Sequence, residues 1–400
     1  MKMSVKKLIK SMNEVLDSLR KENGLFIASW GSFYQLFCWL RDCFYESLSY
    51  LEDQPLLFQQ TYHTILDYLI MLEEKYSKFS LMIKSPHPKY RYRYLHARVS
   101  AETFDEVHEE WGNKQNDVCG ELLYGIAIGI EKGLNIIRNE DDIRIINLLI
   151  KYVEAIEYWH DEDSGYWEED EQVRSSSIGA IVAGLKAMKK LNIPGIEIDE
   201  ELIEKGVNAL NELLPNETPT RFCDLAQLSL IYPFDVVTEE QRDAILHNVE
   251  KYLLKEEGVI RYIGDYYYNR ANYYSANRYK YLNLYIEGDQ DGNEARWIFG
   301  FAYLGQVYLK LGLYEKASKF LGKIFERSEG GKVGELIFKG TKILNENNPL
   351  GWSVSMTKLL SKELLKRGII KKNTLFDVGT KIKSTQKVES IQEIEKQNIA

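Results

Sequence analysis

The sequence predicts an all-α fold, and two observations carry this prediction. Only 8 of the 400 residues are proline, so long segments lack the residue that most strongly interrupts a helix. Apolar residues recur at three- and four-residue intervals along most of the chain, the spacing that places them on one helix face. Strand-like alternation is scarce, although residues 258–268 could form a short extended piece. We therefore expect helical hairpins packed in a ring or a solenoid.

The helical spacing defines twelve segments. In the clearest of them, serines at 175–177 precede an apolar stripe that includes Ile178, Ile181 and Leu185. Serine is a preferred residue at a helix N-terminus, so this pattern gives both a start and a buried face. In chain order, the expected helices span residues 4–21, 32–51, 56–77, 115–133, 140–160, 174–191, 199–214, 221–231, 238–255, 292–311, 314–328 and 352–367.

Four long loops interrupt these helices, at 79–114, 161–173, 256–290 and 329–351. They hold many of the tyrosine, tryptophan and acidic residues, including the run Tyr90-Arg91-Tyr92-Arg93-Tyr94. Loops of this length are uncommon in a compact helical domain unless they have a function. We expect one helical domain over residues 1–372 and a charged, flexible tail over 373–400.

Composition excludes several functional classes. The net charge of −9 argues against nucleic-acid binding, which needs a concentrated positive field. No apolar run reaches membrane-spanning length, and the N-terminus is typical of an amphipathic helix rather than a secretion signal. The six histidines form no ligand pattern, so no metal site is expected. Reduced, buried thiols in a cytoplasmic protein are the simplest interpretation of Cys38, Cys43, Cys119 and Cys223.

One loop has the composition of a carbohydrate site. The tract at 164–169 places Trp167 beside the adjacent carboxylates Glu168 and Glu169, just before a helix start. A carboxyl group pressed against an indole loses hydration, which raises its pKa toward the range of a general acid. Aromatic rings also stack on sugar C–H faces while carboxylates accept sugar hydroxyls. The tract is ambiguous alone, so its partners elsewhere in the chain decide the interpretation.

Five motifs in chain order resemble those of glycoside hydrolase family 15, the glucoamylases. They cover most of the chain between residues 37 and 356, and several also resemble the related domain of the phosphorylase kinase α subunit. The motifs are Phe37-Cys38-Trp39-Leu40-Arg41-Asp42, Trp111-Gly112-Asn113-Lys114-Gln115-Asn116-Asp117, Trp167-Glu168-Glu169, Gly258-Val259-Ile260-Arg261-Tyr262 with Asp265, and Glu335 followed by Pro349-Leu350-Gly351-Trp352-Ser353.

The resemblance implies an (α/α)6 barrel, with six inner and six outer helices and the site in a funnel at one end. The twelve segments found from periodicity agree with that count. The long loops would line the funnel, where acidic and aromatic residues have a physical use.

The resemblance also implies an activity: an inverting exo-acting α-glucosidase that releases β-glucose without a metal or other cofactor. By motif position, Glu168 matches the general acid and Glu335 the general base, with Glu346 as a possible but poorly spaced substitute. Such a pair stands roughly 6.5–9.5 Å apart to leave room for a water molecule.

The remaining implied roles concern the sugar, and the expected partner is an oligosaccharide or polysaccharide. Hydroxyl binding falls to Arg41, Asp42, Glu169 and Arg261, and hydrogen-bond support of the pocket to Asp117. Stacking faces would come from Trp111, Trp167 and Trp352, whereas Trp30, Trp159 and Trp297 are expected in the core.

Three positions depart from the family pattern, and two other functional classes stay open. Asn113-Lys114 replaces an Arg-Pro, Gln35 stands where a tyrosine usually holds the attacking water (Tyr34 is adjacent), and Gly264 replaces a frequent acidic residue. Linkage preference among α-1,4, α-1,6 and trehalose substrates is therefore open. One alternative is a catalytically silent sugar-binding or regulatory barrel. The other is a helical-repeat interaction protein, suggested by a tetratricopeptide-like stretch at 303–317.

Overall fold

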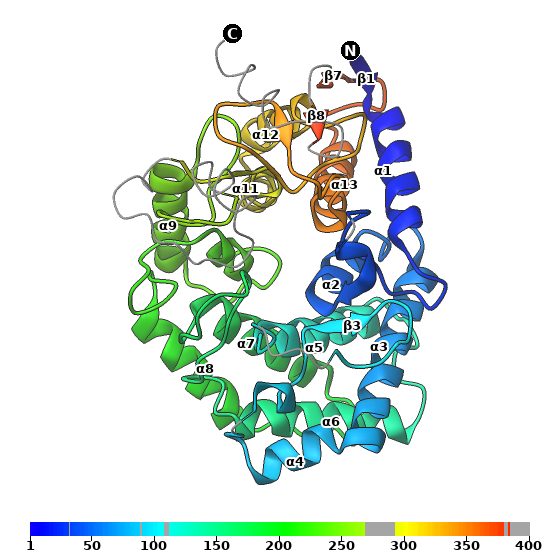
Figure 1. Ribbon diagram of the computed structural model, residues 1–400, viewed down its shortest axis with the longest axis vertical. Helices are drawn as coiled ribbons and strands as arrows, with labels where there is room; N and C mark the ends of the chain where they lie inside the picture. The colour runs from blue at the N-terminus through cyan, green and yellow to red at the C-terminus, as the bar shows by residue number, and fades with distance from the viewer. Residues whose placement is uncertain (32, 89, 108–111, 269–292, 380–382, 385–400) are drawn as a thin grey trace.

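The computed structural model describes residues 1–31, 33–88, 90–107, 112–268, 293–379 and 383–384. In these ranges the chain forms two concentric layers of helices around a common centre (Figure 1). Along the chain, helices of the outer layer alternate with helices of the inner layer, beginning with an outer helix. The predicted all-α (α/α)6 barrel is confirmed.

The inner layer closes on itself, because each of its members contacts the next and the last contacts the first. The inner elements are α2 (Leu40–Leu48), α5 (Asp117–Glu131), α7 (Ser175–Leu191), the short 3-10 helix η3 (Leu225–Leu230), α11 (Phe299–Lys310) and α13 (Gly351–Lys366). The outer elements are α1 (Val5–Leu19), α3 (Pro55–Tyr76), α6 (Glu140–Ala155), α8 (Glu200–Leu213), α9 (Glu239–Asn248) and α12 (Tyr314–Glu326). A further helix, α4 (Lys78–Lys84), packs on α6 at the outer edge.

Short strands tie the loops together at the ends of the helices. β2 (Phe37–Trp39) pairs antiparallel with β3 (Arg98–Ser100), so that Trp39 lies opposite Arg98. β4 (Arg296–Trp297), β5 (Leu336–Ile337), β6 (Ile343–Leu344) and β8 (Lys383–Ser384) form a small sheet in that order. β1 (Lys2–Ser4) pairs with β7 (Leu375–Asp377), which lies in the expected tail. Residues 385–400 of that tail lie outside the described residues.

Several helix predictions are wrong in extent, for identifiable reasons. The segment 32–51 is one helix only from Leu40, because the preceding residues pair with β3. The segment 292–311 becomes helical only at Phe299, after β4 pairs with β5. The segment 221–231 holds only η3. The segment 238–255 is helical over most of its length, as α9 followed by the π-helix η4 (Val249–Leu253). The helix α4 was not predicted. Tertiary strand pairing thus overrides local helical periodicity.

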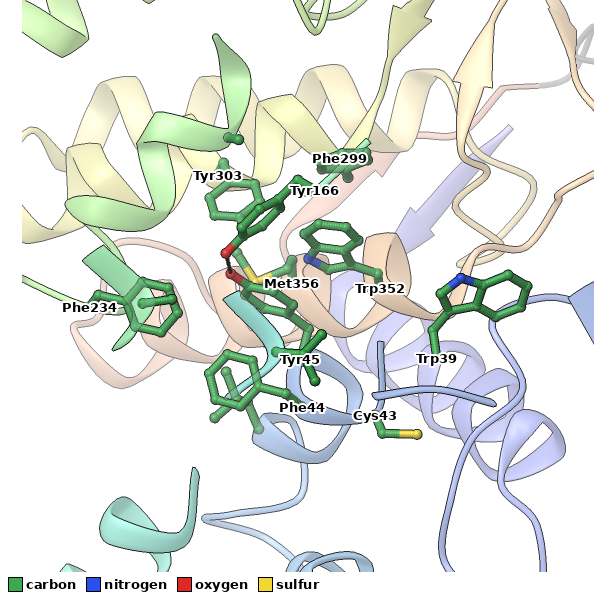
Figure 2. Packing of buried hydrophobic residues seen from close by; sticks show 14 of the residues in the cluster. Trp39, Cys43, Phe44, Tyr45, Tyr166, Phe234, Phe299, Tyr303, Trp352 and Met356 are labelled. Carbon is green, nitrogen blue, oxygen red and sulfur yellow. Dashed lines mark hydrogen bonds between the residues drawn. The ribbon is translucent and has the colours of Figure 1, made fainter. Parts of the chain in front are cut away.

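Close helix contacts and buried rings make the core. A Cβ on Gly120 of α5 would lie 2.2 Å from the Ala180 carbonyl carbon of α7, so only glycine permits this approach. Around the barrel centre, the indole of Trp352 stacks between Tyr45 and Phe299, with ring centroids 4.7 and 4.8 Å apart (Figure 2). The four cysteines are buried and unpaired, as predicted.

The closed inner ring decides against the helical-repeat alternative. The tetratricopeptide-like stretch is the α11–α12 hairpin, turned at Gly312 with a φ of 73°. Its two helices pack on each other and on α13 as one hairpin of the barrel. Among the described residues, no helix combines the length and apolarity needed to cross a membrane. In the same ranges, no group of three or more His, Cys, Asp or Glu side chains is arranged to hold a metal ion.

Candidate functional site

A cavity at one end of the barrel collects most of the predicted site residues. Its walls come from the segment leading into α2, the loop at 161–173, the loop at 258–268, β4, and the segment leading into α13. Seven of the ten predicted residues line it: Arg41, Asp42, Trp167, Glu168, Arg261, Glu335 and Trp352. Arg41 and Trp352 are more than 300 positions apart in sequence, so the fold itself assembles the site.

The other three predicted residues have different positions. Asp117 is fully buried behind Arg41, and Glu169 does not line the cavity itself but pairs with Arg221 and with Arg261, which does. Trp111 lies outside the described residues.

Glu168 is held in a tight loop with an unusual backbone. Asp163 and Gln172 pair at the base of this loop, and Glu168 has a φ of 63°, in the left-handed region that disfavours a branched or bulky residue. The Trp39 indole N–H donates to Glu168 Oε1 over 2.9 Å. Backbone strain of this kind often accompanies a functional side chain, because it fixes where that side chain points.

The environment of Glu168 favours its protonated form. Burial raises the pKa of Glu168, and the opposing effects of the Arg41 charge and the Trp39 hydrogen bond only reduce that rise. The indole that hydrogen-bonds this carboxylate belongs to Trp39, whereas the sequence pointed to the adjacent Trp167. The Trp167 N–H donates instead to Asp224 over 2.8 Å.

Glu335 is fixed by amide and hydroxyl donors. The Asn347 side chain donates to Glu335 Oε2 over 2.8 Å, and the Asn345 amide donates to the same oxygen. The Tyr34 hydroxyl donates to Oε1 over 3.4 Å. Burial raises the pKa of Glu335 to about 7, although the two amides favour its ionised form. This carboxyl group can therefore accept a proton near neutral pH.

The pKa of Asp42 depends on the charges of both Glu168 and Glu335. Burial raises the pKa of Asp42 to about 7; Arg41 opposes this rise, and Glu168 and Glu335 both add to it. Three acidic side chains thus share one partly desolvated cavity, and a negative charge on either glutamate disfavours ionisation of Asp42. Proton uptake and release by this group will be coupled.

Arg41 is held rigidly in the wall. Its Nε donates to Asp117 Oδ2 over 2.7 Å, and its Nη2 donates to Gln115 Oε1 over 2.6 Å. The guanidinium also lies 4.7 Å from the Tyr166 ring centroid. Asp117 therefore supports the cavity from behind, as the sequence suggested, by fixing Arg41.

Glu169 has an environment opposite to that of its neighbour Glu168. Arg221 Nη2 donates to it over 2.8 Å, Arg261 Nη2 over 3.4 Å, and the Tyr262 hydroxyl over 2.5 Å. Burial alone would raise the pKa of Glu169, but the two arginines and the Tyr262 hydrogen bond together lower it. The two adjacent carboxyl groups thus differ in proton affinity, because burial prevails at Glu168 despite Arg41 and is outweighed at Glu169.

Sequence reasoning missed several residues of the cavity wall. Tyr34 and Tyr267 line the cavity with their hydroxyls 3.3 Å apart, and Trp39, Tyr166 and Trp297 are also there. Trp297 was expected in the core; it is buried, but it also faces the cavity. A usable signal existed for Tyr34, since it is one residue from the position where the family pattern has a tyrosine.

One tryptophan prediction is wrong. Trp30 was expected in the core, yet it is 38% exposed and its ring lies 5.1 Å from the Lys332 ammonium. An amphipathic ring at the surface can be covered by a lysine side chain, which a composition argument cannot detect. Trp159 is half-buried and packs against the core.

Gly112 offers a stability test of this site. A Cβ on Gly112 would lie 2.8 Å from the Glu168 carbonyl oxygen and 3.0 Å from its carbonyl carbon. Because backbone atoms cannot move aside easily, Gly112→Ala should destabilise the protein by about 1–3 kcal/mol, measured by denaturant unfolding. The matched control is Gly322→Ala in α12, where the added methyl meets only Phe376 carbons at 3.8 Å. Equal stability of the Gly112 variant and wild type would contradict the observed packing.

Solved structures with the same fold define the class of protein. A glycosidase solved as the wild type has a TM-score of 0.71 at 19% identity, over 90% of this chain and 96% of that chain. A glucoamylase from Saccharomycopsis fibuligera has a TM-score of 0.58 at 15% identity, over 90% and 95% of the two chains. The family 15 glucoamylase from Hypocrea jecorina has a TM-score of 0.58 at 13% identity, over 92% and 73%. This protein is thus a helical barrel with the fold of these glycosidases.

The family assignment is more specific. The sequence model described as glycosyl hydrolases family 15 matches residues 3–296, and the chain belongs to that family. Curated relatives include the probable phosphorylase b kinase regulatory subunit alpha of Drosophila melanogaster, 27% identical over 65% of this chain and 22% of that protein. The liver isoform of Oryctolagus cuniculus is 29% identical over 39% and 14%. The chain thus spans less than a quarter of the length of these two relatives.

Proposed function

We propose that this protein is an inverting, exo-acting α-glucosidase of glucoamylase type. Glu168 protonates the leaving glycosidic oxygen. Glu335 takes a proton from a water molecule, whose oxygen attacks the anomeric carbon from the opposite face. The bond to the leaving oxygen breaks as the bond to water forms, so an α-linked glucose is released in the β configuration.

The observation that carries this proposal is the pairing of Glu168 and Glu335 in one cavity with different partners. Glu168 is buried, has a raised pKa and receives one indole N–H. Glu335 is oriented by two amides and by the Tyr34 hydroxyl. The same hydroxyl lines the cavity, so it can also orient a water molecule. Burial raises the pKa of both carboxyl groups, and their different partners, one indole N–H for Glu168 and three donors for Glu335, suit one acid and one base in acid–base hydrolysis.

The shape of the cavity supports attack at a chain end. Its wall includes the buried rings of Tyr166, Phe299 and Trp352, which pack against one another at the barrel centre (Figure 2) and so fit the closed end of a pocket. Arg41 and Asp42 project from the first turn of α2, where they can bind hydroxyls of one terminal sugar. A variant of the neighbouring glycosidase was solved in complex with glucose, which supports a carbohydrate ligand here.

The direct test is to find the substrate and the anomer of the product. The purified protein is incubated with maltose, maltotriose, soluble starch, isomaltose and trehalose, and released glucose is followed by proton NMR. Initial appearance of β-glucose is expected from at least one of them, and that substrate names the linkage. Initial α-glucose would overturn the inverting mechanism.

A catalytically silent sugar-binding barrel is the second candidate. It is favoured by the curated relatives, which are named as regulatory subunits, and by the departures at Gln35, Asn113 and Gly264. The departure at Gln35 counts for less than the other two. The hydroxyl of the adjacent Tyr34 reaches Glu335, although Gln35 occupies the position where the family usually has a tyrosine. Absence of hydrolysis across the panel, with glucose or maltose still bound, would favour this candidate.

The pH dependence of the reaction can be predicted from Glu335. Its pKa of about 7 places the rising limb of kcat/KM near neutral pH, because the base must be ionised. Asn347→Ala removes a hydrogen bond that favours the carboxylate, so this pKa rises further. Loss of a charge-assisted hydrogen bond of roughly 1.5–3 kcal/mol should move the rising limb of kcat/KM by about one pH unit or more, toward higher pH. A rising limb that stays in place would show that Glu335 is not the titrating base.

A further inference from the structure

A second cavity lies outside the site described above, between the C-terminal end of α3, the helix α4 and the segment at 90–106. Its side walls are the rings of Tyr76 and Tyr92 and the apolar side chains of Leu81 and Met82. The segment that forms it contains the tyrosine–arginine run noted in the sequence, for which the proposed reaction has no role.

The floor of this cavity is a built polar structure. Lys78 and Glu106 are 5% and 7% exposed and form an ion pair of 2.5 Å. The Lys78 ammonium also donates to the Tyr92 carbonyl over 2.7 Å and to the Tyr94 carbonyl over 3.3 Å, which uses all three of its N–H bonds. The two charges on the floor therefore neutralise each other. Lys78 also fixes the backbone on both sides of Arg93, through the carbonyls of Tyr92 and Tyr94.

The rim offers the ring of Tyr92 and one cation. Tyr90 does not line the cavity, but its 50% exposed ring stacks on Tyr92 with centroids 5.5 Å apart at 21°. The exposed Arg93 guanidinium lies over the Tyr92 ring at 5.4 Å and has no carboxylate partner in the described part of the chain. Aromatic faces beside a hydrogen-bond donor suit a pyranose ring, whose C–H face packs on the rings while its hydroxyls accept from the guanidinium.

The segment that forms the second cavity contacts the loop of Glu168 through an ion pair and through a neighbouring hydrogen bond. Arg91 Nε pairs with Glu171 over 2.9 Å, and Glu171 follows Glu168 by three residues. The Asn113 amide donates to the Arg91 carbonyl over 3.3 Å, and the adjacent Gly112 packs against the Glu168 backbone. In Figure 1, α4 lies at the outer edge of the barrel, and β3 lies nearer its centre. β3 pairs with β2, whose residue Trp39 lines the first cavity.

We propose that this second cavity binds a sugar ring of an α-linked glucan and thereby tethers a long substrate beside the first cavity. The proposal rests on the proposed glucan-hydrolysing function for its choice of ligand. A neutral polyhydroxylated ligand fits because the buried charges are already paired with each other. Tethering raises the local concentration of chain ends, so it benefits polymers and not disaccharides.

The test separates binding from catalysis. In native gel electrophoresis through a glycogen-containing gel, the full-length protein should be retarded, and a Tyr92→Ala, Arg93→Ala double variant should lose most of that retardation. Tyr92→Phe, which keeps the ring, should retain it. Arg144→Gln, at an exposed arginine of α6, is the matched surface control.

Kinetics supply the second arm. The double variant should show an unchanged kcat/KM on the shortest substrate and a severalfold lower kcat/KM on glycogen. Equal retardation of wild type and double variant would overturn the proposal, as would equal loss on short and long substrates. Binding of inorganic phosphate, without glycogen binding, would identify an anion site instead and also overturn it. Because gel retardation needs no turnover, it can succeed even if the hydrolytic function fails.

Discussion

Glu168→Gln is expected to reduce kcat on the natural substrate by about 10²–10⁴-fold, the usual contribution of a positioned general acid. Glutamine fills the same space and can still meet the Trp39 N–H through its side-chain oxygen, which now receives that hydrogen bond over about the same distance as the 2.9 Å seen with glutamate. It has no proton to give to the leaving oxygen. The fold and sugar binding should therefore persist while turnover is lost, measured by glucose release and by calorimetric titration with substrate.

The matched control is Glu162→Gln, which makes the same chemical change at an exposed position near the base of the same loop. It should have wild-type turnover. A substrate with a good leaving group, such as an α-glucosyl fluoride, needs less help from an acid, so the Glu168 variant should recover much of its rate on it. Near-normal turnover of Glu168→Gln on maltose-type substrates would show that another group donates the proton.

Helical periodicity predicted the layers of the barrel but not where each hairpin begins. The stripe of α7 was legible because Ile178, Ile181 and Leu185 are all buried at helical spacing. The residues before α2 have similar apolar spacing, yet they form β2 because β3 supplies a partner about 60 positions later. A local pattern cannot contain that information.

The site was predictable only where a short motif carried it. Glu168, Glu335, Arg41 and Asp42 stand in recognisable segments, and all four line the cavity. Arg221 was missed because nothing in the spacing links it to Glu169, although it donates to that carboxylate. Trp297 was missed for a different reason: a tryptophan that lines a closed cavity is as buried as one in the core.

Glu335→Ala is expected to lose activity by a similar factor, about 10²–10⁴, because no group would then activate the attacking water. The amide donors of Asn345 and Asn347 would remain, facing the space left by the carboxylate. That space can admit a small anion. With azide present, azide nitrogen can attack the anomeric carbon while Glu168 protonates the departing oxygen, and the product from an α-linked substrate should be the β-glycosyl azide, detected by NMR.

Glu346→Gln discriminates between the two candidate bases. Glu346 is eleven residues further along and accepts a hydrogen bond from the Tyr268 hydroxyl. The cavity is lined by Glu335 and not by Glu346, so this variant should keep most of the activity and show no azide product. The opposite result, with Glu346→Gln inactive and Glu335→Ala active, would transfer the role of base to Glu346. If Glu335→Ala loses activity and azide does not restore it, Glu335→Gln decides the matter. A Glu335→Gln variant that binds sugar but has no turnover keeps Glu335 as the base. Normal turnover of that variant removes Glu335 from the reaction.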